Sequence, residues 1–450
     1  RPLAGPPRGA GPRGAPRWPD AAPRRAADAA QVLSEDEPSV DPAEGCSIQN
    51  PDQCDGSGEN AFVDRLNVLI EGGLGSALLV AAAAASLTLA NLPATKAAWL
   101  ALWKLRLGPT MGAHALSLKA WVNEGLMALF FFAVGLEIKK EATEGSLASP
   151  RQAALPCLAA LGGMVVPMAV YAAVQYCLPG GSLAGLTVPM ATDIAFAMGV
   201  FQLFYNQMPP AAASFLLALA TVDDLGAIGV IAVCFAGALA PAYLAGGMGV
   251  LGVTALYSQL RFRRESAWIF WLPALLLWYC LLLGGVSADL AGVLVAFCIP
   301  MRSKTGREIV ERLINRWTAA TALLILPVFA LANCAVSLGA SSSSFGAPAA
   351  SLAVPAGIGL GLLVGKPLGI FGATYCAIKA GVGKMPAGMT KRHLGIVGML
   401  GSIGFTMCLF LIENCLRGAT ARMAKLVVLG GSLLAAGLSA LVMSRQPRRA

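Results

Sequence analysis

Long apolar runs separated by short polar loops fill nearly all of the chain after residue 60. Most runs have roughly the twenty residues that an α-helix needs to cross a bilayer. The pattern predicts an all-α polytopic membrane protein with about twelve transmembrane helices, and two short runs at 267–299 leave one merged span as an alternative. The predicted spans are residues 67–90, 121–138, 154–177, 184–204, 212–236, 243–259, 267–284, 286–299, 317–338, 352–378, 394–413 and 421–443.

Residues 1–60 lack this pattern, being rich first in Arg, Pro, Ala and Gly and then in acidic residues. A segment without apolar periodicity cannot bury a core. We therefore divide the chain into a leader at 1–60, a transmembrane domain at 61–445 and a tail at 446–450. The arginine-rich, acid-poor opening is typical of an organellar transit segment, and a disordered leader is the alternative.

Composition agrees with a membrane protein, because 56% of the residues are hydrophobic and only 13% are charged. The net charge of +9 comes from Lys and Arg in the leader and in short loops, which suits membrane topology better than nucleic-acid binding. Loops after the second, sixth, eighth and tenth spans carry these basic residues, and loops after the third, fifth, seventh and ninth carry none. Both ends of the domain are therefore expected on the cytoplasmic side. The spans between them are expected to contact the lipid bilayer.

Two loops depart from this rule, those after the first and eleventh spans. The first contains Gly108-Pro109-Thr110-Met111-Gly112 between alternating segments, which is compatible with a small exposed hairpin suited to contact between two copies of the chain, although the pattern favours an ordinary loop.

The eleven cysteines are scattered and show no CxxC pair or metal-ligand spacing. We interpret most of them as small core residues and leave open a disulfide between Cys46 and Cys54, which bracket a polar turn. Neither a cofactor nor an enzymatic activity is expected.

Four polar residues stand in the apolar stretch 189–224: Thr192, Asp193, Asp223 and Asp224. A charge at membrane depth costs at least about 2.5 kcal/mol, so such residues usually serve a function. Adjacent aspartates on a helix point about 100° apart, so only one of Asp223 and Asp224 need line a cavity. Burial and a nearby like charge both favour the protonated carboxyl, which can then exchange its proton for a cation. We expect Asp224 and the Thr192 hydroxyl to bind Na⁺ and Asp223 to titrate; an inert hydrogen-bonded pair is the alternative.

Two predicted spans look broken, at Pro189 to Asp193 and at Gly401 to Thr406, in matching places of the two halves. Paired interruptions are typical of inverted-repeat transporters, in which half-helix ends meet near the midplane. We expect Asp193 to compensate helix N-termini and Lys366 to compensate C-termini and to pair with Asp193 or Asp223. Pro367 should loosen the helix at Lys366; a snorkelling lysine is the alternative.

The second span ends in Val-Gly-Leu-Glu-Ile-Lys-Lys-Glu, which places Glu137, Lys140 and Glu141 at the cytoplasmic mouth. Three further acids, Glu71, Glu124 and Asp289, lie in or beside apolar runs and have no partner that the sequence identifies.

From about residue 60 to 445 the chain contains seven motifs: Phe-Phe-Ala-Val-Gly-Leu-Glu-Ile-Lys-Lys-Glu, Gly-Ser-Leu-Ala-Ser-Pro-Arg-Gln-Ala-Ala, Ala-Thr-Asp-Ile-Ala-Phe-Ala, Val-Asp-Asp-Leu-Gly-Ala-Ile, Leu-Pro-Val-Phe-Ala-Leu-Ala-Asn, Gly-Lys-Pro-Leu-Gly-Ile and Ile-Gly-Phe-Thr-Met. In these motifs the chain resembles the NhaA family of sodium/proton antiporters. The resemblance implies twelve spans with crossed broken helices four and eleven, and electrogenic exchange of sodium or lithium for protons. It also implies ion and proton carboxylates at Asp224 and Asp223, the broken-helix pair Thr192–Asp193, the bundle lysine Lys366, and a pH-sensing mouth at Glu137, Lys140 and Glu141.

The chain departs from the family at Lys140, where an arginine is usual, and at Val-Ser-Ala-Asp-Leu-Ala-Gly, which lacks the family histidine. Regulation by pH is therefore less strongly implied than transport. The polar leader is also outside the family pattern and favours a plastid membrane over the plasma membrane if it is a transit segment. Two alternative functions are a sodium-coupled symporter of the same architecture and, more remotely, an intramembrane aspartyl protease.

Overall fold

The computed structural model describes residues 70, 73–108, 116–234, 239–261, 270–302, 309–338 and 352–446. The chain divides into two compact units, residues 1–57 and 58–450, and all described residues belong to the second. The predictions for the leader, for Cys46 and Cys54, for Glu71 and for the tail beyond residue 446 concern residues outside this set. Among the described residues the regular structure is helical apart from isolated bridge positions, of which Arg106 and Ser117 form an antiparallel pair.

The first half of the described chain follows the predicted apolar runs, with one added helix in the loop after the first span. That helix is α4, which lies in a segment that was expected to be loop. The elements are α3 (Leu74–Leu89), α4 (Lys96–Leu102), α5 (Leu118–Ala120), the π-helix η2 (Trp121–Leu126), α6 (Met127–Thr143), α7 (Pro150–Cys177), the 3₁₀ turns η3 (Leu183–Gly185) and η4 (Val188–Met190), α8 (Ile194–Gln202), η5 (Tyr205–Gln207) and α9 (Pro210–Cys234).

The second half contains the remaining helices, several of them joined end to end. The short runs at 267–299 form two separate helices, because Gly285 adopts a left-handed φ of 78° that ends the first of them. The elements are α10 (Pro241–Arg261), α11 (Trp271–Gly284), α12 (Leu290–Cys298), α13 (Ile309–Ala320), the π-helix η7 (Thr321–Ile325), α14 (Leu326–Asn333), α15 (Ala353–Leu360), the π-helix η9 (Gly361–Gly365), α16 (Lys366–Lys379), α17 (Lys391–Gly401), α18 (Phe405–Cys415) and α19 (Gly418–Ser444).

Seven helical segments among the described residues are long and apolar enough to cross a membrane, and one of them, Leu183–Gln202, is interrupted at 191–193. The pair α17 and α18, bent by 42° at its break, makes an eighth. Helices α3 and α11 are apolar but shorter. The chain is a multi-pass, all-α membrane protein, and the number of twelve crossings stays a prediction.

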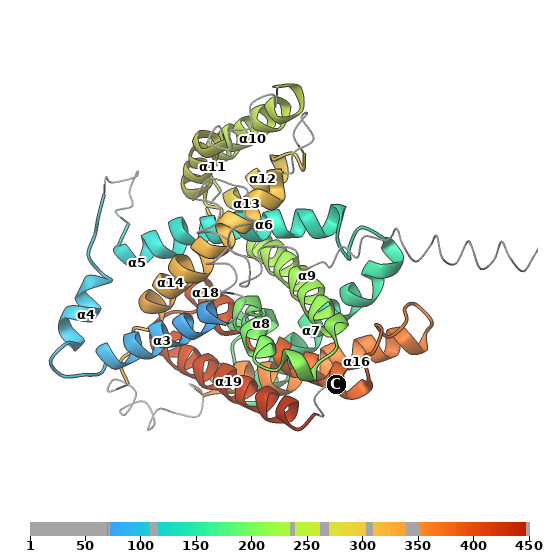
Figure 1. Cartoon of the computed structure of the whole chain (residues 1–450). Coiled ribbons are helices and arrows are strands. Elements are labelled where there is room, and N and C mark those ends of the chain that lie inside the picture. The colour runs from blue at the N-terminus through green and yellow to red at the C-terminus, as the bar shows by residue number, and fades with distance from the viewer. Residues whose placement is uncertain are drawn as a thin grey trace, which may run out of the picture. The chain divides into compact units, whose positions relative to one another are not determined.

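Helix α6 separates two hydrophobic clusters because it is apolar on two faces. One face packs into the larger cluster, which α3, α7–α9 and α14–α19 share. The other packs against α11, α12 and the start of α13, to which α10 is added on the outside (Figure 1). Residues recurring every three or four positions line up along one side of a helix, which explains the two faces. The first face includes Phe131, Val134 and Ile138, and the second includes Ala128, Phe132 and Leu136.

Helices α7 and α16 pack so closely that their backbones touch at two glycines. A Cβ atom at Gly369 would lie 2.2 Å from the carbonyl oxygen of Gly162, and one at Gly162 would lie 2.5 Å from that of Gly369. Lys366 lies one turn before Gly369, so this contact fixes the height and direction of the helix that carries the lysine.

The π-helix η9 ends at Gly365, directly before Lys366 and Pro367. Proline has no N–H to donate and clashes with the carbonyl four residues earlier, so a wider turn before it relieves the helix. Helix α14 repeats this arrangement, because the π-helix η7 ends two residues before Pro327. The predicted loosening at Pro367 is confirmed.

We expect Gly369→Ala to destabilise the protein by about 1–3 kcal/mol, because the added methyl group forces α7 and α16 apart. Thermal unfolding in detergent would measure the loss. Gly372→Ala on the same helix is the matched control, since a Cβ there meets no atom within 4 Å. Equal stability of the two variants would contradict the close packing.

Candidate functional site

Two interrupted helices meet at the centre of the larger cluster. The first changes from the 3₁₀ turn η4 to an extended segment at 191–193 and then to α8, and the second breaks between α17 and α18. The two breaks touch directly, because the Asp193 N–H donates to the carbonyl of Ile403 at 2.7 Å. The predicted meeting of the two broken spans is confirmed in the geometry.

The Asp193 carboxylate caps the helices that start on both sides of this contact. Its Oδ1 accepts from the N–H of Phe196 at 3.0 Å, in the first turn of α8. Its Oδ2 accepts from Thr406 twice, from the N–H at 2.9 Å and from the hydroxyl at 2.6 Å, in the first turn of α18. A carboxylate that satisfies unpaired N–H groups at two N-termini also offsets the positive ends of both helix dipoles.

Lys366 reaches the same region from α16 and forms an ion pair with Asp223. Its Nζ lies 2.8 Å from Asp223 Oδ2, and both side chains are fully buried. The ammonium also donates to the carbonyl of Met190, at the end of η4. The structure thus selects Asp223 over Asp193 as the partner, and the lysine does not snorkel.

Thr192 is held on the Asp223 side of the site. Its Oγ1 lies 2.5 Å from Asp223 Oδ2 and 3.1 Å from the carbonyl oxygen of Gly401, at the C-terminal end of α17. A hydroxyl has one proton, so it donates to one of these oxygens at a time. Thr192 therefore contacts the C-terminal end of α17. Lys366 contacts the C-terminal end of η4, so the prediction that this lysine compensates a helix C-terminus is confirmed there.

Asp224 points away from this ion pair and lines a cavity of about 230 Å³. Its Oδ1 has no hydrogen-bond partner among the described residues, and only 1% of the residue is exposed. The cavity wall also contains Asp193, Thr406 and Glu137, but neither Thr192 nor Asp223 is part of it. Adjacent aspartates on α9 thus face different surroundings, as the 100° offset between them predicts.

Glu137 joins the cavity from α6, while its predicted partners at the mouth make other contacts. The Lys140 Nζ lies 2.9 Å from a carboxylate oxygen of Glu311, and both side chains are partly exposed. The Glu141 carboxylate accepts from the N–H and the hydroxyl of Ser146, both at 3.0 Å. Of the three mouth residues, only Glu137 shares a cavity with Asp224.

Comparison with known proteins places the chain in a family. The family model described as Na+/H+ antiporter 1 matches residues 67–443. The chain belongs to the Na+/H+ antiporter 1 family. A protein named Na(+)/H(+) antiporter NhaA 1 from Erythrobacter litoralis is 40% identical over 361 residues, which cover 80% of this chain and 87% of the relative. The antiporter NhaA of Cronobacter sakazakii is 40% identical over 372 residues, covering 80% and 92%, and that of Shewanella loihica is 41% identical over 320 residues, covering 70% and 80%.

Membership of this family confirms the resemblance drawn from the motifs. The matched region corresponds closely to the predicted transmembrane domain and leaves out the leader. The remote alternative of an intramembrane aspartyl protease finds no support in an antiporter family, whereas the buried lysine that neutralises Asp223 suits ion transport.

Two acids without a predicted partner, Glu124 and Asp289, lie near each other where α12 packs on the segment leading into α6. Asp289 Oδ2 accepts from the Ser287 hydroxyl at 3.0 Å, and its Oδ1 has no hydrogen-bond partner among the described residues. Trp278 of α11 donates to the backbone carbonyl of Glu124 at 2.8 Å. The sequence could not pair these acids, because they are far apart along the chain.

Three polar residues of the broken-helix region have contacts that the sequence did not predict: Thr406, Glu413 and Lys425. Thr406 belongs to the glycine-rich break and is a direct partner of Asp193. Glu413 lies at the end of α18, and Lys425 lies two turns inside α19, with 7% of its side chain exposed. The sequence signal for the Glu413–Lys425 pair was an acid near the end of one apolar run and a base near the start of the next.

We expect Lys366→Ala to lower the free energy of unfolding by about 3–5 kcal/mol, because Asp223 is left buried without its counter-charge. Adding Asp223→Asn should recover about 1–2 kcal/mol of this loss, since the uncompensated charge is removed. Thermal unfolding in detergent would measure both. Lys379→Ala, at an exposed lysine of the same helix, is the control and should change stability by at most about 0.5 kcal/mol. Additive losses in the double variant would contradict the pairing.

Proposed function

We propose that the protein exchanges Na⁺ for H⁺ across a membrane, with Li⁺ as an alternative cation, and that the exchange is electrogenic. The relatives named as Na(+)/H(+) antiporters support the activity. The observation that carries the site assignment is a pair of adjacent carboxylates of which one lines a cavity and the other is paired with a buried lysine. The activity serves sodium and pH homeostasis.

Cation binding is assigned to Asp224. Sodium is a hard cation that prefers oxygen ligands, and the wall of the cavity contains the carboxylate of Asp224 and the hydroxyl of Thr406. Thr192, expected as a second sodium ligand, joins the site if its hydroxyl exchanges its contact with Asp223 for one with the cation. The carboxylate of Asp193 contributes charge at a fixed place, because two helix N-termini hold it.

Proton binding is assigned to Asp223 and Asp224 together. An ionised Asp223 keeps Lys366 in its ion pair, and a protonated Asp223 no longer balances the ammonium. Asp224 releases its proton when a cation enters and takes one up again when the cation leaves. Release of protons from both acids for one cation moves net charge, which makes the exchange electrogenic.

Access to Asp224 from one side is supported by the cavity wall. The wall runs from Asp224 to Glu137 and includes Gln202 at the end of α8 and Thr318 of α13. We propose that Glu137, Lys140 and Glu141 form the mouth of this path and adjust transport to pH. A sodium-coupled symporter would use the same fold but has no need of two adjacent acids with one held by a lysine.

Two further assignments concern the surroundings of the protein. We propose that two copies associate through the segment after the first span, where Arg106 and Ser117 pair and where the Trp121 indole donates to the carbonyl of Leu107 at 2.8 Å. The membrane is the plasma membrane or, if the leader is a transit segment, a plastid membrane.

Purified protein in liposomes tests the function. Added Na⁺ should collapse a preset pH gradient, read by a pH-sensitive dye. Asp224→Asn should reduce the response to that of protein-free liposomes, because the amide does not ionise and so cannot trade a proton for a cation. Glu144→Gln is the control, since it removes an exposed carboxylate that pairs with Arg302. An unchanged response in Asp224→Asn would refute the site, and no response in the unmodified protein would refute the exchange.

A further inference from the structure

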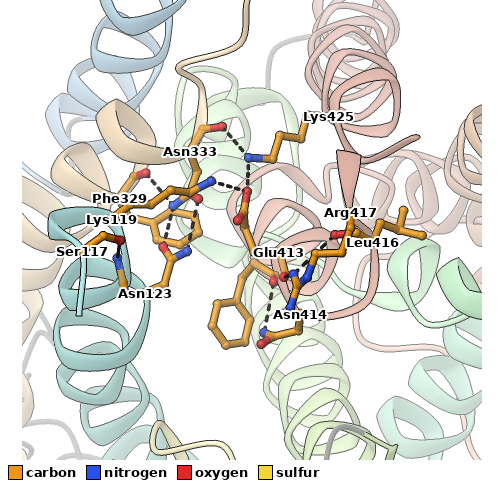
Figure 2. Close-up of polar contacts among 12 residues, drawn as sticks. Ser117, Lys119, Asn123, Phe329, Asn333, Glu413, Asn414, Leu416, Arg417 and Lys425 are labelled. Atoms are coloured by element: carbon orange, nitrogen blue, oxygen red, sulfur yellow. Dashed lines mark hydrogen bonds and ion pairs between the residues drawn. The ribbon is translucent and has the colours of Figure 1, made fainter. Parts of the chain in front are cut away.

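Five polar side chains form a network (Figure 2). Lys119 and Asn123 of this network lie at the start of the helical segment 118–143, and Glu137 lies near its other end. Glu413 of α18 lies between two lysines, with Lys119 Nζ at 2.6 Å from its Oε1 and Lys425 Nζ in contact with the same oxygen. Lys425 also donates to the carbonyl of Asn333 at 3.0 Å, and the Asn333 amide donates to Asn123 Oδ1 at 2.8 Å. The network therefore joins α5 and η2, α14, α18 and α19.

Position along α18 relates this network to the ion site. Glu413 follows Thr406 by seven residues, which is about two helical turns, so the two side chains share a face of the helix about 10 Å apart. Phe410 lies between them on that face and contacts Phe131 of α6 and Phe329 of α14, with ring centroids at 5.5 and 6.5 Å. All three rings are buried. The site is thus followed by an aromatic layer and then by the charged network.

Helices α14 and α18 of this network also line the cavity on the other side of the site. Its wall is drawn from α3, α6 and the α13–η7–α14 segment on one hand, and from α8, α9 and α18 on the other. The network joins these two sets at the far end. Lys119 and Asn123 lie on α5 and η2, which run on into α6, and Asn333 ends α14 of the first set. Glu413 belongs to the second set, and Lys425 lies on the adjoining α19. Opening the site toward that end requires the two sets to separate there.

We propose that Lys119, Glu413 and Lys425 form a salt-bridge lock that closes the end of the transport path opposite Glu137 and opens once in each transport cycle. The inference rests on the proposed exchange function. Glu413 is a positioning residue in this scheme, because it acts through the two lysines and α18 and does not touch the cation. In the closed state both lysines are attracted to the Glu413 carboxylate, and this electrostatic attraction is lost when α18 moves away.

A reversible cross-link tests whether the lock must open. In Lys119→Cys/Glu413→Cys protein reconstituted in liposomes, a bifunctional methanethiosulfonate should tie the two positions together. Transport should fall at least tenfold and return after reduction. The two single variants, treated identically, are the controls for reaction at native cysteines. Continued exchange by protein that mass spectrometry shows to be cross-linked would overturn the lock, whereas exchange in the untreated single variants tests the function separately.

A second measurement separates gating from a merely structural role. Glu413→Gln weakens the closed end, so the KM for Na⁺ should fall about threefold or more at the Lys119 face and rise at the Glu137 face, because the populations of the two states shift. Glu413→Asp, which keeps the charge, should show a smaller shift. If Glu413→Gln does not fold, Lys119→Gln replaces it, since the Glu413–Lys425 pair remains. A lower maximal rate with the same KM at both faces would overturn the proposal.

Discussion

Burial of charge where two helices break is the constraint on which the rest of this structure depends. An interrupted helix exposes N–H and C=O groups that no water can satisfy in a bilayer. The Asp193 carboxylate accepts hydrogen bonds from N–H groups at the N-termini of both α8 and α18. That carboxylate requires positive partners or aligned dipoles nearby, and the helix ends supply them. The pairing of Lys366 with Asp223 balances the neighbouring charge. Each half of the crossing is therefore stable only in the presence of the other.

The packing around the crossing follows from this requirement. Helix α16 has to bring Lys366 to a fixed point, and its glycine contact with α7 leaves little freedom in how the two helices approach. Helix α6 packs against the cluster that contains the broken helices on one face and against α11 and α12 on the other. It therefore lies between the two hydrophobic clusters. The two sides of the site differ, because a cavity lies on one side and packed aromatic rings lie on the other.

The sequence predicted the elements of the site better than their connections. Apolar runs, glycine and proline breaks, and acids at membrane depth are local signals, and they located the helices, both interruptions, Lys366 and the aspartate pair. Lys366 pairs with Asp223 because of the way α9, α16 and η4 pack. A local sequence pattern does not specify that packing. The same reason explains why Lys366 contacts the end of η4 while the Thr192 hydroxyl contacts the end of α17. Glu413 and Lys425 were overlooked because, near the ends of apolar runs, a charged residue is usually at the surface, and only packing reveals that these two are joined.

The π-helix before Lys366 has a consequence for the helical register. A π turn holds one more residue than an α turn, so every side chain after it is rotated by about 100° relative to an uninterrupted helix. The direction of Lys366 is therefore determined by the number of residues between Gly361 and Gly365 as well as by its neighbours. Losing one residue there would leave the composition and hydrophobicity of the span almost unchanged while turning the ammonium toward a different helix. Length, as much as residue identity, is what this segment has to preserve.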